Sequence, residues 1–339
     1  MTKTMNRQFV LAGRPEGKAR ASDFRLEEAS LPTLQKGEVL FRNTLLSVDP
    51  YQRNLMGNGS SELPPIDVGA VMPGPTVAVI EHSNNADFAI GDHVQTWSGW
   101  REYGVSDGSD LRKLDPTAAP VSTALGVLGH TGLTAWNGMR LIADTRPGGT
   151  VVVTAAAGSV GSMAAQIAKM RGYRVVGIAG GAKKVAFLKD DLGLDEAVDY
   201  KASDFEEQLQ RALPGGIDGL YDNVGDYMFE ALMESFNKQA RILIGGTIAG
   251  YSDTGFSDRG DRLPRLLNLF LYRLIEIRGF NLLDHLASYP EFLEEAAPWV
   301  AEGRIKYTEE FVEGFEKTPE TFLRLFDGSH DGKLIVKLA

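Results

Sequence analysis

Two glycines three residues apart, Gly158 and Gly161, are the residues whose type and spacing most directly suggest chemistry. They follow the strand-like run "TVVVT" and open a helical pattern, so they mark a strand-to-helix turn within a βαβ unit. Such a turn lets a pyrophosphate approach the backbone and meet the N–H groups of the helix N-terminus. Ala156 stands where the dinucleotide fingerprint has its first glycine, which is tolerable if that residue keeps an ordinary φ. The same spacing also fits a tight strand–helix junction without a ligand.

The residues after the next strand distinguish between cofactors. That strand runs to Ile178, and no acidic residue follows it to bind the ribose 2′-hydroxyl of NAD. Lys183 and Lys184 follow instead, and a positive charge there suits the 2′-phosphate of NADP. A solvated lysine pair at the start of a helix is the alternative. The pattern favours NADPH as the cofactor. Tyr200, after the third strand, is expected near the adenine end of the cofactor, and the alternative is that it packs in the protein core as a lone tyrosine.

The elements that must position these residues fall into two kinds. Up to about residue 120, short apolar runs alternate with Gly, Pro, Asn and Asp clusters, which is typical of β structure. From Gly149 onward, apolar strand-like runs alternate with helical ones, which predicts a parallel sheet covered on both faces. After about residue 300 a strand, a helix and a terminal strand are expected, and that last strand is a candidate to return to the first domain's sheet. The predicted fold class is α/β, with a β-rich domain and a doubly wound parallel-sheet domain inserted into it.

Composition disfavours several kinds of partner. The chain carries 45 acidic and 35 basic side chains, and the resulting net charge of −10 argues against nucleic-acid or anionic-membrane binding. It has no cysteine, which excludes disulfides, a thiol nucleophile and cysteine-ligated zinc, and which fits the cytoplasm. The N-terminal residues lack the apolar core of a signal peptide, and charges interrupt the most apolar late stretch, so no membrane span is expected.

Segments along almost the whole chain resemble the zinc-independent medium-chain dehydrogenase/reductase superfamily. The chain is most similar there to the group of prostaglandin reductases, leukotriene B4 dehydrogenases, plant double-bond reductases and bacterial curcumin reductases. The resemblance implies a GroES-like catalytic domain from residues 1–122 and 301–339, with a Rossmann domain of residues 123–300 inserted. It also implies NADPH-dependent reduction of the C=C bond of α,β-unsaturated ketones or aldehydes, and a homodimer. The matching segments are "SVDPYQRNLM", "GWREYGV", "LGHTGLTAW", "AAAGSVG", "LGLDEAVDYK", "YDNVG", "GGTIAGY", "EGFEKTPETFLRLFDG" and "GKLIVK".

The resemblance also carries site residues over to this chain, position by position. Most would bind the cofactor's pyrophosphate, 2′-phosphate, adenine or nicotinamide. His330 stands where the group has an asparagine in its C-terminal "GxNxGK" motif. Histidine differs from asparagine in shape and charge, so a pH dependence of this cofactor contact near neutrality becomes an expectation. The residues concerned are Gly158, Ser159, Val160, Gly161, Gly180, Lys184, Tyr200, Asn223, Gly245, Thr247, Gly279, Phe280, Asn281 and His330.

Metal chemistry is not expected. The five histidines are scattered singly, and no cysteine is present to complete a zinc site. Without a metal, hydrogen-bond donors must polarise the substrate carbonyl as hydride reaches the β-carbon and an enolate develops.

Tyr251 occupies the group's active-site tyrosine position and is the predicted catalytic and substrate-binding donor. The alternative for Tyr251 is a loop aromatic that only packs against substrate. Tyr51 is the second predicted substrate-binding residue, and a structural turn aromatic is as plausible there. Residues 252–275 fit either a lid over the substrate or an ordinary packed helix with a long connection.

Two other functions fit the same residues. A quinone reductase of the neighbouring zinc-free branch would use the same cofactor site. A hydrogen-bond donor positioned at the substrate carbonyl, such as Tyr251, favours enone reduction, because quinone reduction has less need of one. A non-enzymatic NADPH-binding protein is the other alternative, as lens crystallins of this superfamily illustrate. The sequence leaves the physiological substrate open, because pocket width decides among prostaglandin-like, curcumin-like and short alkenal substrates.

Overall fold

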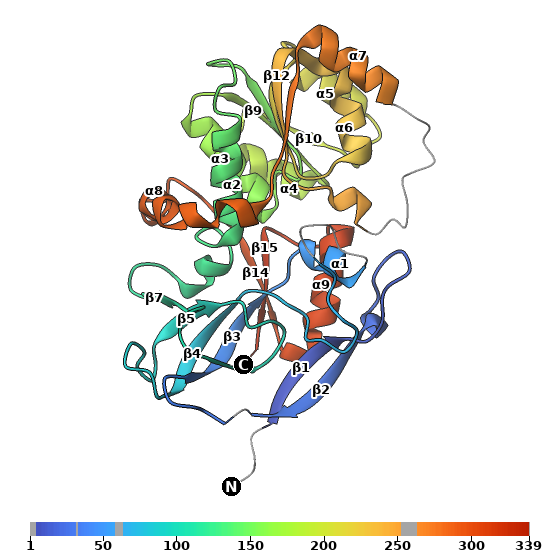
Figure 1. The fold of residues 1–339 in the computed structure, drawn as a ribbon. Coiled ribbons are helices and arrows are strands. Elements are labelled where there is room, and N and C mark those ends of the chain that lie inside the picture. Colours follow the sequence, from blue (N-terminus) through green and yellow to red (C-terminus); the bar gives the residue numbers. More distant parts are fainter. Residues whose placement is uncertain (1–4, 32, 58–63, 252–262, 339) are drawn as a thin grey trace. The chain divides into compact units, whose positions relative to one another are not determined.

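The computed structural model describes residues 5–31, 33–57, 64–251 and 263–338. The chain divides into two compact units, coloured along the sequence in Figure 1. We call residues 1–126 with 309–339 the first unit, and residues 127–308 the second unit.

The first unit is built on a mostly antiparallel sheet. Among the described residues its strand order is β14-β15-β3-β4-β5-β7, and β6 pairs with β3. The C-terminal strand β15 lies antiparallel to β3, with Ile335 opposite Ser47, so segments from the two ends of the chain share one sheet. The strands are β3 (Val39–Ser47), β4 (Thr76–Ser83), β5 (His93–Thr96), β6 (Tyr103–Ser106), β7 (Arg112–Leu114), β14 (Glu309–Glu313) and β15 (Lys333–Lys337).

An aromatic core holds the rest of the first unit to this sheet. Trp100 is fully buried and stacks on Phe24, with ring centroids 5.2 Å apart, and Phe322 meets it edge-on. Phe24 begins strand β2 and Phe322 lies in helix α9, so one tryptophan joins a hairpin and a helix. The remaining elements are β1 (Met5–Leu11), β2 (Phe24–Ser30), α1 (Tyr51–Met56) and α9 (Thr318–Asp327).

The second unit contains the predicted parallel sheet. Its order among the described residues is β10-β9-β8-β11-β12-β13, and every neighbouring pair is parallel. Numbered within this unit, that order is 3-2-1-4-5-6, the arrangement of dinucleotide-binding sheets, so the predicted doubly wound fold is confirmed. The strands are β8 (Thr150–Val153), β9 (Arg174–Ala179), β10 (Glu196–Asp199), β11 (Ile217–Asp222), β12 (Phe236–Ile244) and β13 (Glu276–Gly279).

Helices cover both faces of this sheet, as Figure 1 shows. On one face Leu220 and Ile242 pack with Leu209 of α5 and Met228 of α6. On the other face the Tyr221 hydroxyl donates to a carbonyl of α2, and α3 packs on α2. Apolar residues on both sides of each strand explain the continuous hydrophobic runs in the sequence. The helices are α2 (His130–Leu141), α3 (Ser159–Met170), α4 (Ala182–Ala186), α5 (Phe205–Ala212), α6 (Asp226–Leu232), α7 (Leu263–Arg273) and α8 (Tyr289–Ala301).

Candidate functional site

The strand order places a ligand site at the carboxyl ends of β8 and β11. These two strands are neighbours, but the chain leaves β8 towards β9 on one side and reaches β11 from β10 on the other. In open parallel sheets such a switch point leaves a crevice at the strand ends. The loops after β8, β9, β10, β11 and β12 therefore supply the candidate site residues.

The turn after β8 shows why an alanine replaces the first fingerprint glycine. Ala155, not Ala156, takes the left-handed conformation, with φ of +48°. Ala156 keeps an ordinary φ, is fully buried, and its N–H donates to the Ile178 carbonyl at 2.9 Å. An alanine side chain costs little at such a position, so the condition for replacing that glycine is met.

The two glycines of this turn meet different constraints. A Cβ on Gly161 would lie 2.3 Å from the Ala155 carbonyl oxygen, so helix α3 packs too closely on the turn for any side chain. A Cβ on Gly158 would lie 3.2 Å from that same oxygen, which is its single neighbour within 4 Å among the described residues that are not adjacent in the chain. Gly158 thus leaves an open face where a ligand can reach the backbone, next to Ser159 and Val160 in the first turn of α3.

The predicted lysines lie directly beyond β9. Gly181 has φ of +94° and precedes α4, in which Lys183 is exposed and Lys184 half-buried. The nearby acid is Asp199 at the end of β10, and its Oδ1 accepts the N–H groups of Gly181 (2.8 Å) and Lys201 (2.9 Å). This carboxylate therefore organises two loops, and the end of β9 itself carries no acidic residue.

Tyr200 lies against the glycine that follows β9. A Cβ on Gly180 would lie 2.8 Å from the Tyr200 ring, so ring and backbone are in contact. Lys201 Nζ lies 5.8 Å from the same ring centroid, a cation–π distance. Sequence reasoning missed Lys201 as a candidate cation. Its signal was its place beside Tyr200 in "VDYK", one strand over from Lys184.

A buried carboxylate organises the loop after β11. Asp222 is fully buried, and its Oδ1 accepts the Thr154 hydroxyl at 2.7 Å and the Val224 N–H at 3.0 Å. Asn223 is held from two sides, because its N–H donates to Thr154 Oγ1 and its Nδ2 to the Thr154 carbonyl, both at 2.8 Å. The sequence predicts a role for Asn223 but none for Thr154 or Asp222, because their contact joins residues 68 apart in the chain.

The loop after β12 packs on the backbone of the same aspartate. The N–H groups of Gly245 and Gly246 both donate to the Asp222 carbonyl, at 2.7 and 3.1 Å. A Cβ on Gly225 would lie 3.2 Å from the Thr247 side chain, so these loops touch. The structure thus brings Asn223, Gly245 and Thr247 together.

Tyr251 follows a short 3-10 turn at the end of that loop. It is half-buried, and its N–H bonds to the Ile248 carbonyl at 3.3 Å. This turn comes directly after Thr247, whose side chain lies beside Gly225. Residues 252–262 of the suggested lid lie outside the described residues, and 263–273 form helix α7.

The residues after β13 take part in local structure. Phe280 donates its N–H to the Ile244 carbonyl at 3.1 Å and stacks on His285, with centroids 5.0 Å apart. Asn281 Oδ1 accepts the Leu283 N–H at 3.1 Å and so caps the following turn. Gly279 has no described atom within 4 Å of its Cβ position.

Tyr51 and His330 belong to the first unit. Tyr51 begins α1, and its buried hydroxyl makes no hydrogen bond of ordinary geometry within the described part of the chain. Burial, and then the negative charge of Asp49, raise the pKa of Tyr51 well above its usual value. His330 Nδ1 lies 3.0 Å from the Arg324 carbonyl and donates to it, so a neutral ring presents Nε2 as an acceptor.

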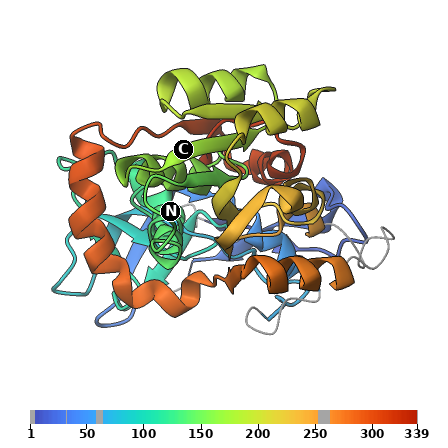
Figure 2. The same ribbon diagram turned by 90° about the horizontal axis from the view of Figure 1, so that it is seen from above.

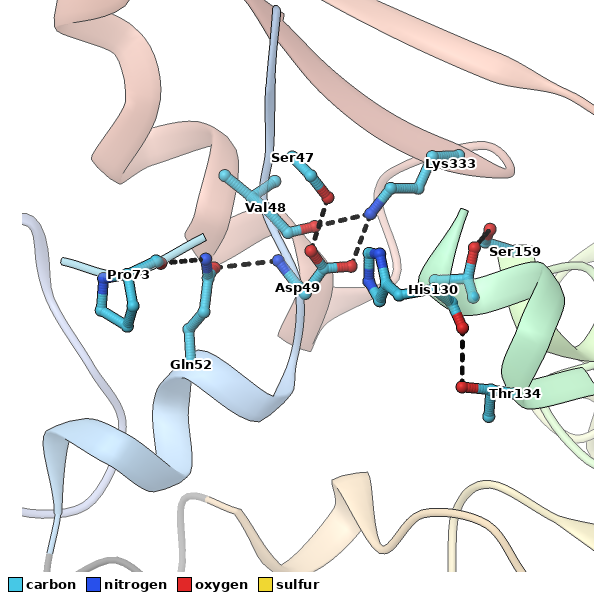
Figure 3. Close-up of polar contacts among 10 residues, drawn as sticks. Ser47, Val48, Asp49, Gln52, Pro73, His130, Thr134, Ser159 and Lys333 are labelled. Carbon is cyan, nitrogen blue, oxygen red and sulfur yellow. Dashed lines mark hydrogen bonds and ion pairs between the residues drawn. The ribbon is translucent and has the colours of Figure 1, made fainter. Parts of the chain in front are cut away.

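A buried ion pair anchors the loop that carries Tyr51, as Figure 3 shows. Lys333 Nζ lies 2.5 Å from Asp49 Oδ1 and 3.2 Å from the Val48 carbonyl, and both side chains are nearly inaccessible. Ser47 donates to the other Asp49 oxygen at 2.5 Å, and the Asp49 N–H donates to Gln52. No sequence signal pointed to this pair, because its members are 284 residues apart.

Two further findings concern the described residues only. They contain no group of three or more His, Asp or Glu side chains placed to hold a metal ion. None of their helices is both long and apolar enough to cross a membrane.

Comparison with known proteins extends over the whole chain. A family profile described as the N-terminal domain of oxidoreductase matches residues 7–114, and one described as zinc-binding dehydrogenase matches residues 159–298. The chain is 42% identical to the NADPH-dependent curcumin reductase of Escherichia coli, over 99% of this chain and 98% of that protein. It is 39% identical to prostaglandin reductase 1 of Oryctolagus cuniculus, over 92% and 87% of the two chains. The crystal structure of CurA from Vibrio vulnificus in complex with NADPH superposes with a TM-score of 0.94, at 41% identity over 98% and 99% of the chains.

Proposed function

Because the chain belongs to the zinc-independent medium-chain dehydrogenases/reductases, in the prostaglandin reductase and curcumin reductase group, we propose that it reduces α,β-unsaturated ketones and aldehydes with NADPH. The observation that carries this proposal is the relation to NADPH-dependent reductases over nearly the full length of both chains. The product is the saturated carbonyl compound, formed by adding hydride to the β-carbon and a proton to the α-carbon.

The second unit's strand ends fit NADPH. Gly158 leaves a backbone face that a Cβ would begin to fill, beside the N-terminal turn of α3, which suits a pyrophosphate. Asp199, the acidic residue close to the end of β9, already accepts hydrogen bonds from two backbone N–H groups. Lys184 and Lys201 supply positive charge for a 2′-phosphate. Tyr200 offers a ring face for the adenine end. Asn223, Gly245, Thr247 and the residues after β13 would hold the nicotinamide side.

Tyr251 supplies the donor that the chemistry requires. NADPH, when bound, supplies the hydride. The Tyr251 hydroxyl donates a hydrogen bond to the substrate carbonyl oxygen, where negative charge grows as the β-carbon accepts that hydride. Its place directly after the loop of Gly245 and Thr247 supports this role. The resulting enolate then takes a proton at its α-carbon from solvent, with the tyrosine hydroxyl holding the oxygen in place.

The test measures NADPH oxidation with a simple enone, an alkenal and a quinone. We expect turnover of the enone and alkenal, and Tyr251→Phe should lower kcat by about 10²–10³-fold while NADPH affinity stays unchanged. Tyr103→Phe, on strand β6 of the first unit, is the matched control and should keep wild-type turnover. Unchanged turnover in Tyr251→Phe would remove that residue from the mechanism. Turnover of the quinone alone would replace enone reduction by quinone reduction, and binding of NADPH with no turnover would favour a non-enzymatic role.

A homodimer forms through the edge of the second unit's sheet. Strand β13 is the edge strand among the described residues, and all four of its residues are exposed. Figure 2 shows α7, β13 and α8 following one another, in orange, along one edge. An exposed edge strand with apolar neighbours is a template for pairing with another strand, here a second copy of the chain. The exposed apolar residues of this region are Leu263, Leu267, Leu271, Tyr272, Leu274, Ile277, Leu283 and Leu286.

Analytical ultracentrifugation tests this assembly. The 36.9 kDa chain should sediment at about twice its monomer mass, and Ile277→Asp should shift it towards the monomer. Ile90→Asp places the same charge at a residue that is 69% exposed in the first unit, and it should leave the dimer intact. A wild-type monomer, or a dimer insensitive to Ile277→Asp, would contradict this interface.

A further inference from the structure

A buried carboxylate stands at the switch point of the second unit's sheet, and the proposed mechanism gives it no role. Asp222 ends strand β11, is fully buried, and pairs with no cation within the described part of the chain. Neutral donors surround it instead: the Thr154 hydroxyl at 2.7 Å, the Val224 N–H at 3.0 Å and the Gly225 N–H at 3.1 Å. A buried charge is tolerated only when such donors replace the lost water, so this carboxylate holds its partners firmly.

The carboxylate decides how the Thr154 hydroxyl is oriented. Backbone N–H groups reach both oxygens of Asp222, so this carboxyl group acts as an acceptor, and the single hydroxyl proton of Thr154 must point towards it. The lone pairs of the same hydroxyl oxygen are then left for another donor, and the Asn223 N–H takes that place at 2.8 Å. Asp222 therefore holds Asn223 through Thr154, across the ends of two neighbouring strands.

The side chain of Asn223 is fixed by the same threonine. Its Nδ2 donates to the Thr154 carbonyl at 2.8 Å, and because a carbonyl only accepts, the amide atom in this contact must be the nitrogen. The amide oxygen is thus turned away from Thr154, and it accepts no hydrogen bond from the residues that the structure describes. A Cβ on Gly245 would lie 3.5 Å from this oxygen, so the glycine leaves space beside it. The half-buried Asn223 offers a ligand an oriented acceptor.

The position of this acceptor along the sheet indicates which part of the cofactor it would meet. Neighbouring strands lie in the order β10-β9-β8-β11. Lys184 follows β9 and Tyr200 follows β10, and both are proposed partners of the adenosine half. The glycine turn after β8 is the proposed pyrophosphate site. Asn223 follows β11, on the other side of β8, and therefore stands on the nicotinamide side of that turn.

We propose that Asp222 and Thr154 are positioning residues for the nicotinamide half of NADPH. They hold the Asn223 amide with its oxygen outward, where it accepts a hydrogen bond from an N–H or O–H group of the nicotinamide riboside. The effect of both residues on the cofactor passes through Asn223. This inference rests on the proposed function, because it takes NADPH as the ligand.

Calorimetric titration with NADPH and with adenosine 2′,5′-bisphosphate tests this role. The bisphosphate carries the adenosine half of the cofactor and lacks the nicotinamide. In Thr154→Val, which keeps the side-chain shape but loses the hydroxyl, we expect the Kd of NADPH to rise about tenfold, the value of one hydrogen bond. The Kd of the bisphosphate should stay within about twofold of wild type. Asp222→Asn should give the same selective loss, and Thr154→Ser, which keeps the hydroxyl, should bind NADPH like wild type.

A double-mutant cycle separates positioning from general damage to the fold. Asn223→Ala should weaken NADPH binding by a similar factor, and adding Thr154→Val to it should weaken binding no further. Thr145→Val is the matched control, because it removes another buried threonine hydroxyl of the second unit, which donates to the Ile142 carbonyl at 2.7 Å. Thr145 lies in the segment that leads into β8, so this variant should lower the melting temperature and leave both Kd values unchanged.

Three results would overturn the positioning role. They are equal losses for both ligands in Thr154→Val, additive losses in the double variant, and unchanged NADPH affinity in Asn223→Ala. The last of these keeps the test decisive if Thr154→Val does not fold, since Asn223 is only half-buried. No substrate enters these titrations. A wild-type protein that binds NADPH but reduces no enone therefore contradicts the proposed function alone, while the titrations still decide the role of Asp222 and Thr154.

Discussion

The candidate site residues of the second unit are held mainly by backbone packing, whereas those of the first unit are held by buried side chains. In the second unit, glycines, alanines and backbone N–H groups form most of the surface at the strand ends. The shape of this candidate site is set by how closely the main chain packs. In the first unit, the loop of Tyr51 is held by charged and polar side chains buried together. A site formed by close backbone packing is distorted when a side-chain atom is added. A site held by a network of side chains is destabilised when one partner of a hydrogen bond or ion pair is removed. Substitutions of opposite kinds therefore test the two units.

Removing one partner of the buried ion pair should have the largest effect on stability. Lys333→Met leaves the Asp49 carboxylate buried without its cation, and we expect a loss of about 3–5 kcal/mol in the free energy of unfolding. Urea denaturation measures it. The double variant Lys333→Met/Asp49→Asn should recover part of the loss, while Lys337→Met, which breaks an exposed pair, should cost less than about 1 kcal/mol. Equal costs at Lys333 and Lys337 would show that burial of the pair is unimportant.

Adding one methyl group to the glycine turn should have the next largest effect. In Gly161→Ala the new Cβ meets a carbonyl oxygen at 2.3 Å, so we expect about 1–3 kcal/mol of destabilisation. Gly158→Ala, where the nearest atom is at 3.2 Å, should cost less stability but still weaken NADPH binding. Thermal melts and calorimetric titration distinguish the two variants. If both lose stability equally, close packing of α3 on the turn is not the constraint.

The cofactor's extra phosphate should show a smaller and selective effect. Lys184→Ala removes a charged donor from the proposed 2′-phosphate position and should weaken NADPH binding about tenfold, while NADH affinity is unchanged. Lys201→Ala should do the same more weakly, and Lys238→Ala, on strand β12, is the control. Isothermal titration with both cofactors measures this. Equal losses for NADPH and NADH would contradict the assignment of the 2′-phosphate.

The smallest expected effect concerns a buried carboxyl group of the first unit. Burial raises the pKa of Glu309, although the Ser122 hydroxyl and Lys333 act against that shift. Because the folded pKa lies above the unfolded value, ionisation destabilises the fold as pH rises through this window. Glu309→Gln keeps an acceptor for Ser122, so its melting temperature should be slightly above wild type near about pH 8 and equal to it near about pH 4. A wild-type advantage at the higher pH would reverse the sign of this effect.

Prediction from sequence succeeded where the information was local. The parallel sheet follows from apolar runs alternating with helical ones, and the glycine turn lies within about twelve residues of chain that contain strand, turn and helix start. The replacement of the first fingerprint glycine by Ala156 also has a local explanation. Ala155 takes the left-handed conformation, so Ala156 keeps an ordinary φ. The predicted roles of Tyr251, Lys184 and the other site residues stay predictions, which substitution of those residues would test.

The features that sequence reasoning missed are contacts between distant residues. Asp49 meets Lys333 across 284 residues, and Thr154 meets Asp222 across 68. The exposure of Trp97 has no local sign in the sequence either, because only the packing of its loop shows that its backbone is held while its ring is exposed.

By itself, then, the sequence determined the elements of this protein, their fold class and the family to which it belongs, because periodicity and turn residues act over short stretches of chain. Only the tertiary structure decided which polar groups are buried together and which aromatic rings stand exposed. Burial and partnership depend on strand order and packing, and residues that are far apart in the chain supply the two halves of each contact.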